Sequence, residues 1–235
     1  MHTLGPLGIL ELQHGGVIVV EGNIGTGKTG LCDEVRTDLL TKGVVPDDII
    51  IVDEPSIGTP KGRDLLEKFC DDPERWAFEL QMFMMTNRHA TYKRYSVIAK
   101  REKKIVILDR SLLADSVFAK ANRGRMKAEE YAEYEAAYAR ACSNITPPMM
   151  IIYLHSPPEI CLERVKVRGR ACEMDMELEY LQTLDGIFEE WVGSLEGHMV
   201  RDVDWSFDKH SAEGAGTFRE RIEAITTDIV NALTR

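Results

Sequence analysis

A glycine-rich segment near the N-terminus has residue types and spacing that suit phosphate chemistry. Residues 17–30 read VIVVEGNIGTGKTG, in which an apolar run is followed by the pattern G-x-x-x-x-G-K-T. Glycines let successive backbone N–H groups turn inward on phosphate oxygens, and a helix beginning at Lys28 adds the positive end of its dipole. In such loops the lysine reaches the β- and γ-phosphates of ATP, and the next hydroxyl binds Mg²⁺. The segment therefore predicts a phosphate loop (P-loop) formed by Gly22, Asn23, Ile24, Gly25, Thr26, Gly27, Lys28 and Thr29.

Two other nucleotide-binding interpretations compete for the same segment. Gly25-x-Gly27-x-x-Gly30, with Asp53 and Glu54 after the next apolar run, is the pattern of a dinucleotide-binding dehydrogenase. That pattern gives no role to Gly22 or to the adjacent Lys28 and Thr29, so we favour the P-loop. A guanine-nucleotide switch would need Asn-Lys-x-Asp and Asp-x-x-Gly motifs, and the sequence contains neither.

Charged residues follow two further apolar runs, where a bound ligand would meet them. Asp53-Glu54-Pro55 and Asp109-Arg110-Ser111 each close such a run, and in doubly wound sheets ligands bind beyond the carboxyl ends of the strands. A carboxylate facing Lys28 can orient or deprotonate an acceptor hydroxyl, and a second carboxylate followed by arginine can hold Mg²⁺. Downstream, Arg164, Arg168 and Arg170 surround Gly169. They suit the charge of a phosphoryl-transfer transition state, although their spacing fits a solvated basic patch equally well.

These residues need a parallel sheet to bring them together, and the pattern of the chain predicts one. Helical patterns alternate with β-rich runs, which indicates right-handed crossovers and a three-layer α/β fold of the P-loop type, with five parallel strands flanked by helices. The expected strands are Val17–Glu21, Ile49–Glu54, Ile105–Asp109, Met149–His155 and His198–Val203. We expect helices to begin at Lys28, at Asp72-Pro73, at Ala128, at Pro158 and at Leu178, and a further one to follow a cap at Ser111. A final helix carries apolar residues from Phe218 to Leu233 on one face.

Composition limits the class of protein and its partners. The 235 residues suit one domain, and a formal charge of −10 argues against nucleic acid or an anionic membrane as the main partner. Five cysteines without a C-x-x-C pair predict a reducing compartment. The sequence has no signal-peptide or membrane-span pattern, so we expect a cytoplasmic protein.

The first fifteen residues form a separate question. We expect residues 1–15 to be an N-terminal extension and residues 16–235 to be a single P-loop domain. Leu7, Ile9, Leu10 and Leu12 make the extension more apolar than a loose tail. It can pack on its own subunit, or serve as an arm that pairs with a neighbouring chain.

Taken together, the motifs resemble those of the deoxyribonucleoside kinases, and more narrowly the deoxyadenosine and deoxyguanosine kinases. The resemblance runs from about Val17 to Trp191. It rests on GNIGTGKT, on Asp53-Glu54-Pro55, on residues 71–78 (DDPERWAF) with Gln81, on Asp109-Arg110-Ser111, and on RGRACE at residues 168–173.

The resemblance implies an activity and a role for each matching residue. It implies transfer of the γ-phosphoryl group of ATP to the 5′-hydroxyl of a deoxynucleoside with Mg²⁺, usually by a homodimer, with a tetramer conceivable through the extension. Glu54 matches the base beside the 5′-hydroxyl, Arg110 the arginine that steadies it, and Asp109 the acidic residue near the metal that Thr29 also binds. The lid arginines match Arg164, Arg168 and Arg170, and Glu173 matches the acceptor of the sugar 3′-hydroxyl.

The expected base-binding residues lie on one helical face. Gln81, Met84, Met85 and Arg88 recur at spacings of three, four and seven, and an amide can make two hydrogen bonds to adenine. Relatives that accept purines or deoxycytidine resemble this chain in pairing an arginine like Arg88 with an aspartate like Asp115. The sequence therefore favours deoxyadenosine, then deoxyguanosine, with deoxycytidine further back.

One departure and two alternative functions remain. Relatives often carry a tyrosine where this chain has Cys70, so Glu173 holds the 3′-hydroxyl alone or another tyrosine assists it. A nucleoside monophosphate kinase, such as a thymidylate kinase, would share the fold, but Glu54 would repel its acceptor phosphate. A non-catalytic P-loop protein would need neither Glu54 nor the lid arginines.

Overall fold

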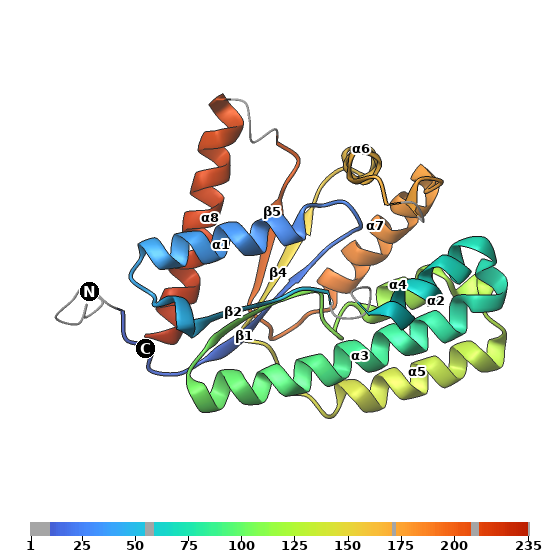
Figure 1. Ribbon diagram of the computed structural model, residues 1–235, viewed down its shortest axis with the longest axis horizontal. Helices are drawn as coiled ribbons and strands as arrows, with labels where there is room; N and C mark the ends of the chain where they lie inside the picture. Colours follow the sequence, from blue (N-terminus) through green and yellow to red (C-terminus); the bar gives the residue numbers. More distant parts are fainter. Residues whose placement is uncertain (1–9, 55–58, 171–172, 208–211, 235) are drawn as a thin grey trace.

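The computed structural model describes residues 10–54, 59–170, 173–207 and 212–234 (Figure 1). It contains one five-stranded sheet in the order β2-β3-β1-β4-β5, and every neighbouring pair of strands is parallel. The predicted α/β class and parallel sheet are confirmed. The strands are β1 Gly16–Glu21, β2 Ile49–Val52, β3 Ile105–Asp109, β4 Met150–His155 and β5 Val200–Asp204.

Helices cover both faces of the sheet and give a three-layer arrangement (Figure 1). In β1, Ile18 and Val20 join the core beneath α1 and α8, while Val17 and Val19 join the core on the side of α3. All four side chains are buried, as expected for a central strand of a parallel sheet. The helices are α1 Lys28–Thr41, α2 Pro60–Asp71, α3 Pro73–Glu102, α4 Asp115–Ala121, α5 Ala128–Cys142, α6 Pro158–Arg168, α7 Leu178–Gly193 and α8 Ala212–Leu233, with 3-10 turns η1 Pro46–Asp48 and η2 Arg123–Arg125.

Two sequence expectations about helices need correction. No helix was predicted over α2, although Thr59 caps it by accepting a hydrogen bond from the Gly62 N–H at 3.0 Å and Pro60 begins it. Ser111 does not cap α4, which begins four residues later at Asp115. Its hydroxyl instead donates to Glu21 at 2.6 Å and accepts from the Leu113 N–H at 3.1 Å.

Part of the N-terminal extension packs against its own chain. Leu10 and Leu12 are buried in the core beneath α1 and α8, and the Leu10 N–H donates to the Gly43 carbonyl at 2.8 Å. This packing favours the first interpretation of the extension for residues 10–15, whereas Leu7 and Ile9 lie outside the described residues. Among the described helices, none is both long and apolar enough to cross a bilayer.

Candidate active site

The P-loop lies where the carboxyl end of β1 meets the N-terminus of α1. Gly22, Gly25 and Gly27 have φ angles of 147°, 81° and 99°, which side-chain-bearing residues rarely adopt. A Cβ at Gly22 would lie 2.1 Å from the Leu154 carbonyl oxygen, and one at Gly25 would lie 2.3 Å from that of Cys161. A Cβ at Gly30 would meet nothing within 4 Å. The structure thus requires a glycine at Gly22, which only the P-loop pattern uses, and does not require one at Gly30, which only the dinucleotide pattern uses.

Lys28 is buried inside the loop that it is expected to serve. Its Nζ donates to the Asn23 carbonyl at 2.7 Å and lies 3.3 Å from that of Gly22. Burial, together with the positive charge of Arg110, lowers the pKa of Lys28 to about 7. An ammonium held on uncharged carbonyls gains strongly from a phosphate that offers a full negative charge.

Thr29 and Asp109 bring two oxygen ligands together at the start of α1. The Thr29 hydroxyl donates to Asp109 Oδ2 at 2.5 Å, and β3 carries Asp109 to the strand end next to β1. A hydroxyl beside a carboxylate is a donor set that Mg²⁺ accepts when phosphate oxygens complete its shell. These residues therefore fit the predicted metal position.

Glu54 lies between two guanidinium groups just beyond the end of β2. Arg88 donates a hydrogen bond to Glu54 Oε1, and Arg110 Nε lies 3.5 Å from the same oxygen. Burial alone would raise the pKa of Glu54, but the charges of Arg110 and Arg88 lower it below its ordinary value. Glu54 is therefore an ionised carboxylate that can accept a hydrogen bond from a hydroxyl.

Arg110 adopts an unusual backbone conformation that directs its side chain into the site. Its φ of 69° is one of two positive values among the non-glycine residues that the structure describes. Nη1 donates to the Gly22 carbonyl at 2.9 Å, and the guanidinium carbon lies 4.6 Å from the centre of the Phe118 ring. Arg110 thus links the P-loop to Glu54.

The predicted base-binding residues gather on α3 and α4. Arg88 Nη1 donates to Asp115 Oδ1 at 2.5 Å, which confirms the pairing expected from the sequence. Gln81 and Met84 are 4% and 8% exposed and lie on the same face of α3. Gln81 Oε1 is buried without a hydrogen-bond partner among the described residues, so it is an acceptor that a ligand can satisfy.

The lid residues engage protein groups in this structure. Arg168 Nη2 donates to Glu173 Oε2 at 2.5 Å, and Arg170 Nη1 lies 3.4 Å from Oε1. Arg164 instead donates to the carbonyls of Thr26, at 3.0 Å, and Trp205, at 2.9 Å. Arg164 therefore ties the P-loop to the segment after β5, and its expected place over the phosphates stays a prediction.

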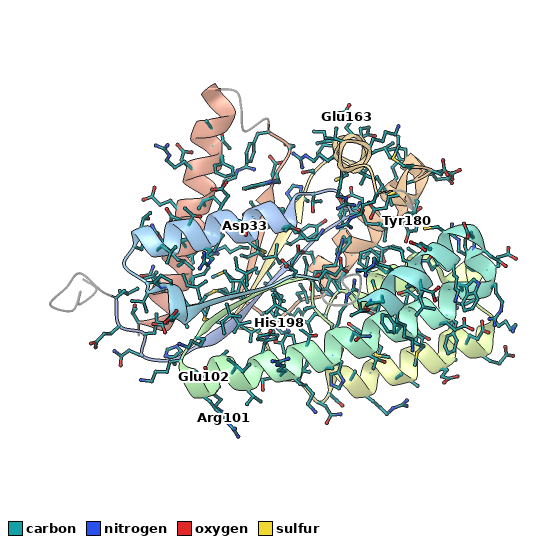
Figure 2. All side chains as sticks on the ribbon, viewed as in Figure 1. Asp33, Arg101, Glu102, Glu163, Tyr180 and His198 are labelled. Atoms are coloured by element: carbon teal, nitrogen blue, oxygen red, sulfur yellow. The ribbon has the colours of Figure 1, made fainter. Side chains whose placement is uncertain are left out.

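Sequence reasoning missed two tyrosines next to these groups. The Tyr134 hydroxyl donates to Asp115 Oδ2 at 2.6 Å, and Tyr180, at the N-terminal end of α7 (Figure 2), accepts from Asn122 Nδ2 at 3.1 Å. Tyr180 also lies near Arg110 and Cys70 and interacts electrostatically with both. Because neither tyrosine falls in a motif, only the folded arrangement reveals these contacts.

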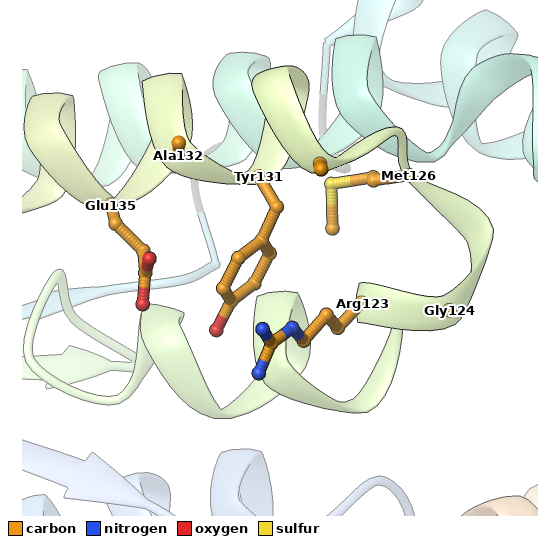
Figure 3. Close-up of a pocket in the computed structure, with 7 residues that line it drawn as sticks. Arg123, Gly124, Met126, Tyr131, Ala132 and Glu135 are labelled. Carbon is orange, nitrogen blue, oxygen red and sulfur yellow. The ribbon is translucent and has the colours of Figure 1, made fainter.

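A shallow depression of about 490 Å³ lies between η2 and α5 (Figure 3). Its wall includes Arg123, whose guanidinium carbon lies 4.9 Å from the centre of the Tyr131 ring. None of the predicted site residues lines it. We therefore place the candidate active site at the strand ends, between the P-loop, Glu54 and α3.

Comparisons with known proteins bear on the family and the fold of this chain. A family model described as deoxynucleoside kinase matches residues 18–229. A deoxyguanosine kinase of Dictyostelium discoideum is 32% identical over 194 residues, which are 81% of this chain and 64% of that enzyme. A deoxyadenosine/deoxycytidine kinase of Bacillus subtilis is 29% identical over 207 residues, which are 84% of this chain and 88% of that enzyme. The chain therefore spans less than two thirds of the length of the first relative.

A solved structure shares the same fold. A deoxyadenosine kinase from M. mycoides, solved with the products dCMP and dCDP, superimposes with a TM-score of 0.70 at 24% identity. The match covers 91% of this chain and 98% of that one. It confirms the predicted arrangement of helices around the parallel sheet.

Proposed function

The chain belongs to the deoxynucleoside kinase family, and we propose that it transfers the γ-phosphoryl group of ATP to the 5′-hydroxyl of a purine deoxynucleoside. The observation that carries this proposal is the setting of Glu54. Its carboxylate is kept ionised by Arg88 and Arg110, and Arg110 bonds in turn to the P-loop carbonyl of Gly22. This arrangement suits a hydroxyl acceptor, because a carboxylate attracts a hydroxyl proton and repels a phosphate.

The chemistry proceeds mainly by positioning. Glu54 accepts the proton of the 5′-hydroxyl as its oxygen bonds to the γ-phosphorus, and the bond from that phosphorus to the β-phosphate oxygen breaks to release ADP. Lys28 and the loop N–H groups stabilise the charge on the phosphates. Because the transition state is loose, we expect proton removal to contribute less than alignment and neutralisation of charge.

Mg²⁺ would be held by Thr29 and Asp109, and it would neutralise and orient the phosphates of ATP. The hydroxyl and the carboxylate lie side by side, so both could serve the same metal ion.

Recognition of the base is assigned to α3 and α4. Gln81 offers a buried acceptor that has no partner in the described part of the chain and an amide donor, a combination that suits the N6-amino group and N7 of adenine. The Arg88–Asp115 pair closes the far end of the same face. We therefore place deoxyadenosine first, deoxyguanosine second and deoxycytidine third, with Met84 packing on the base.

The lid is proposed to exchange partners when substrates bind. Arg168 and Arg170 leave Glu173 for the triphosphate, and Glu173 accepts the sugar 3′-hydroxyl. We propose that Tyr180 assists Glu173, since it lies near Arg110 and near Cys70, the position at which relatives often carry a tyrosine. Arg164 supports the P-loop through Thr26.

Steady-state assays of ADP release with Mg-ATP and each of the four natural deoxynucleosides test the proposal. We expect deoxyadenosine to give the highest kcat/KM, and Glu54→Ala to lower kcat by about two to four powers of ten. Glu163→Gln, an exposed change on α6, is the matched control.

The same ADP-release assay, repeated with nucleoside monophosphates as acceptors, separates this proposal from the two alternative functions. Activity on deoxyadenosine monophosphate or thymidine monophosphate as the acceptor, without activity on nucleosides, would establish a monophosphate kinase. ATP binding without acceptor-dependent ADP release would establish a non-catalytic protein.

We further propose a homodimer, as the family resemblance implies. Light scattering after size exclusion distinguishes monomer, dimer and tetramer. Removal of residues 1–9 then tests whether the extension joins dimers into tetramers, because only a tetramer of that kind would dissociate to dimers.

A further inference from the structure

Glu21 is a buried carboxyl group that the mechanism above does not use. It ends β1, directly before the P-loop, and is 1% exposed. Its Oε1 accepts two hydrogen bonds from one residue, from the Ser111 N–H at 2.8 Å and from the Ser111 hydroxyl at 2.6 Å. The other oxygen, Oε2, has no partner among the described residues.

The two bonds fasten the residue that follows Arg110. A positive φ is costly for a residue with a long side chain and persists only where the surroundings hold it. The Arg110 N–H donates to the Val20 carbonyl at 3.0 Å, and the Ser111 N–H donates to Glu21. The peptide groups on both sides of Arg110 are therefore held by two consecutive residues of β1.

We propose that Glu21 is a positioning residue that holds the Ser111 turn, and thereby aims the Arg110 guanidinium at Glu54 and the P-loop. The role rests on the proposed function, because its effect on turnover passes through Arg110. The Ser111 hydroxyl extends the same connection by accepting the Leu113 N–H at 3.1 Å, in the segment that leads to α4 and Asp115.

Burial of the Glu21 carboxyl group is energetically unfavourable, so its presence at this position needs a compensating interaction. Desolvation raises the pKa of Glu21 to about 7, although Ser111, Arg110 and Arg88 oppose the rise. The compensating interaction is with Ser111: without Glu21, the buried N–H and hydroxyl of Ser111 would lose the acceptor that they share.

A double-mutant cycle between Glu21 and Arg110 tests the proposal. Glu21→Ala should lower kcat about tenfold to a hundredfold, because misalignment of about 1 Å can have an effect of this size. In the background of Arg110→Ala the same change should alter kcat by less than about twofold, since the group it aims is already absent. If the double variant instead showed the product of the two single losses in kcat, the two residues would act independently and the proposal would be overturned.

Rescue by a conservative variant separates positioning from proton transfer. Glu21→Gln retains an oxygen that accepts both Ser111 bonds, so kcat should stay within about fivefold of the wild type. A loss as large as that of Glu21→Ala would overturn the positioning role. Thr226→Ala is the matched control: it removes a buried hydroxyl that donates to Asp38 between α1 and α8, remote from the turn, and should leave kcat unchanged.

Two measurements keep the test decisive if Glu21→Ala does not fold or if the chain phosphorylates no deoxynucleoside. Ser111→Ala removes one of the two bonds and should lower kcat by about threefold to tenfold, again only when Arg110 is present. Amide hydrogen exchange at Ser111 needs no activity and should be faster in Ser111→Ala than in wild type. Unchanged exchange would overturn the proposal, whereas an inactive wild type with faster exchange in the variant would overturn only the proposed function.

Discussion

Arg88, on α3, joins Glu54 to Asp115 at the start of α4. One nitrogen of its guanidinium bonds to Glu54 and another to Asp115, and the side chain is 4% exposed. The residue expected to read the base thus also holds the carboxylate expected to accept the substrate proton. We therefore expect binding of the base and alignment of the 5′-hydroxyl to be coupled through one side chain.

Loss of the Asp115 charge should weaken this coupling. Asp115→Asn replaces a charged acceptor of Arg88 in a fully buried setting, so kcat/KM for deoxyadenosine should fall by about tenfold to a hundredfold. Tyr134→Phe removes only the hydroxyl that donates to Asp115, and its loss should be smaller, about threefold to tenfold. Equal rates for both variants and the wild type, in steady-state assays, would disprove the coupling.

The pH dependence of the rate should report on Arg88. Burial raises the pKa of Glu54, and the charges of Arg110 and Arg88 outweigh it, so the pKa lies below its ordinary value. Arg88→Leu removes one charge, so the acid limb of kcat/KM should move to higher pH by about one unit or more. Arg88→Lys retains the charge and should leave the limb nearly in place. An acid limb that stays put in both variants would show that Glu54 does not control it.

The sequence predicted the sheet and the phosphate loop because both depend on local patterns. Buried parallel strands are short apolar runs, and a P-loop is eight consecutive residues. The same patterns missed α2, whose residues are mostly charged or exposed, with only Gly62 and Leu65 buried. Leu65, Leu66 and Phe69 nevertheless form a short apolar face that packs on α3, a helical signal that the sequence reasoning overlooked.

Partners far apart in the sequence were predicted only where a family motif supplied them. Arg88 and Asp115 were paired in advance through the resemblance, and the structure confirms that pair. No motif contains Tyr134, and Ser111 was assigned to a cap because its hydroxyl type favours caps. Helical spacing placed Arg164 on a face but could not identify the carbonyls that bind it.

The lid should show opposite effects on its two substrates when Glu173 loses its charge. Arg168 and Arg170 are bound to Glu173 in this structure. In Glu173→Gln they are released more easily, so KM for ATP should fall by about twofold to fivefold, within the small range expected for partly exposed ion pairs. KM for deoxyadenosine should rise by about tenfold, because a neutral amide accepts the 3′-hydroxyl more weakly.

Glu163→Gln provides the control for this prediction, since it neutralises an exposed carboxylate on α6, the helix that also carries Arg168 (Figure 2). Both KM values should match the wild type there. If Glu173→Gln raised the two KM values together, Glu173 would serve the general shape of the lid rather than exchange partners.

Paired glycine substitutions distinguish the P-loop from the dinucleotide pattern. Gly22→Ala places a Cβ 2.1 Å from the Leu154 carbonyl oxygen at a φ of 147°, so the loop must shift, and ATP binding should weaken by more than about a hundredfold. Gly30→Ala lies within α1, where its Cβ meets no atom within 4 Å, so the free energy of unfolding should rise by about 0.5 to 1 kcal/mol. Calorimetric ATP titration and denaturant unfolding measure the two effects. A dinucleotide turn would need Gly30 for close packing and has no role for Gly22, so loss of stability in Gly30→Ala, with ATP binding intact in Gly22→Ala, would refute the phosphate-loop assignment.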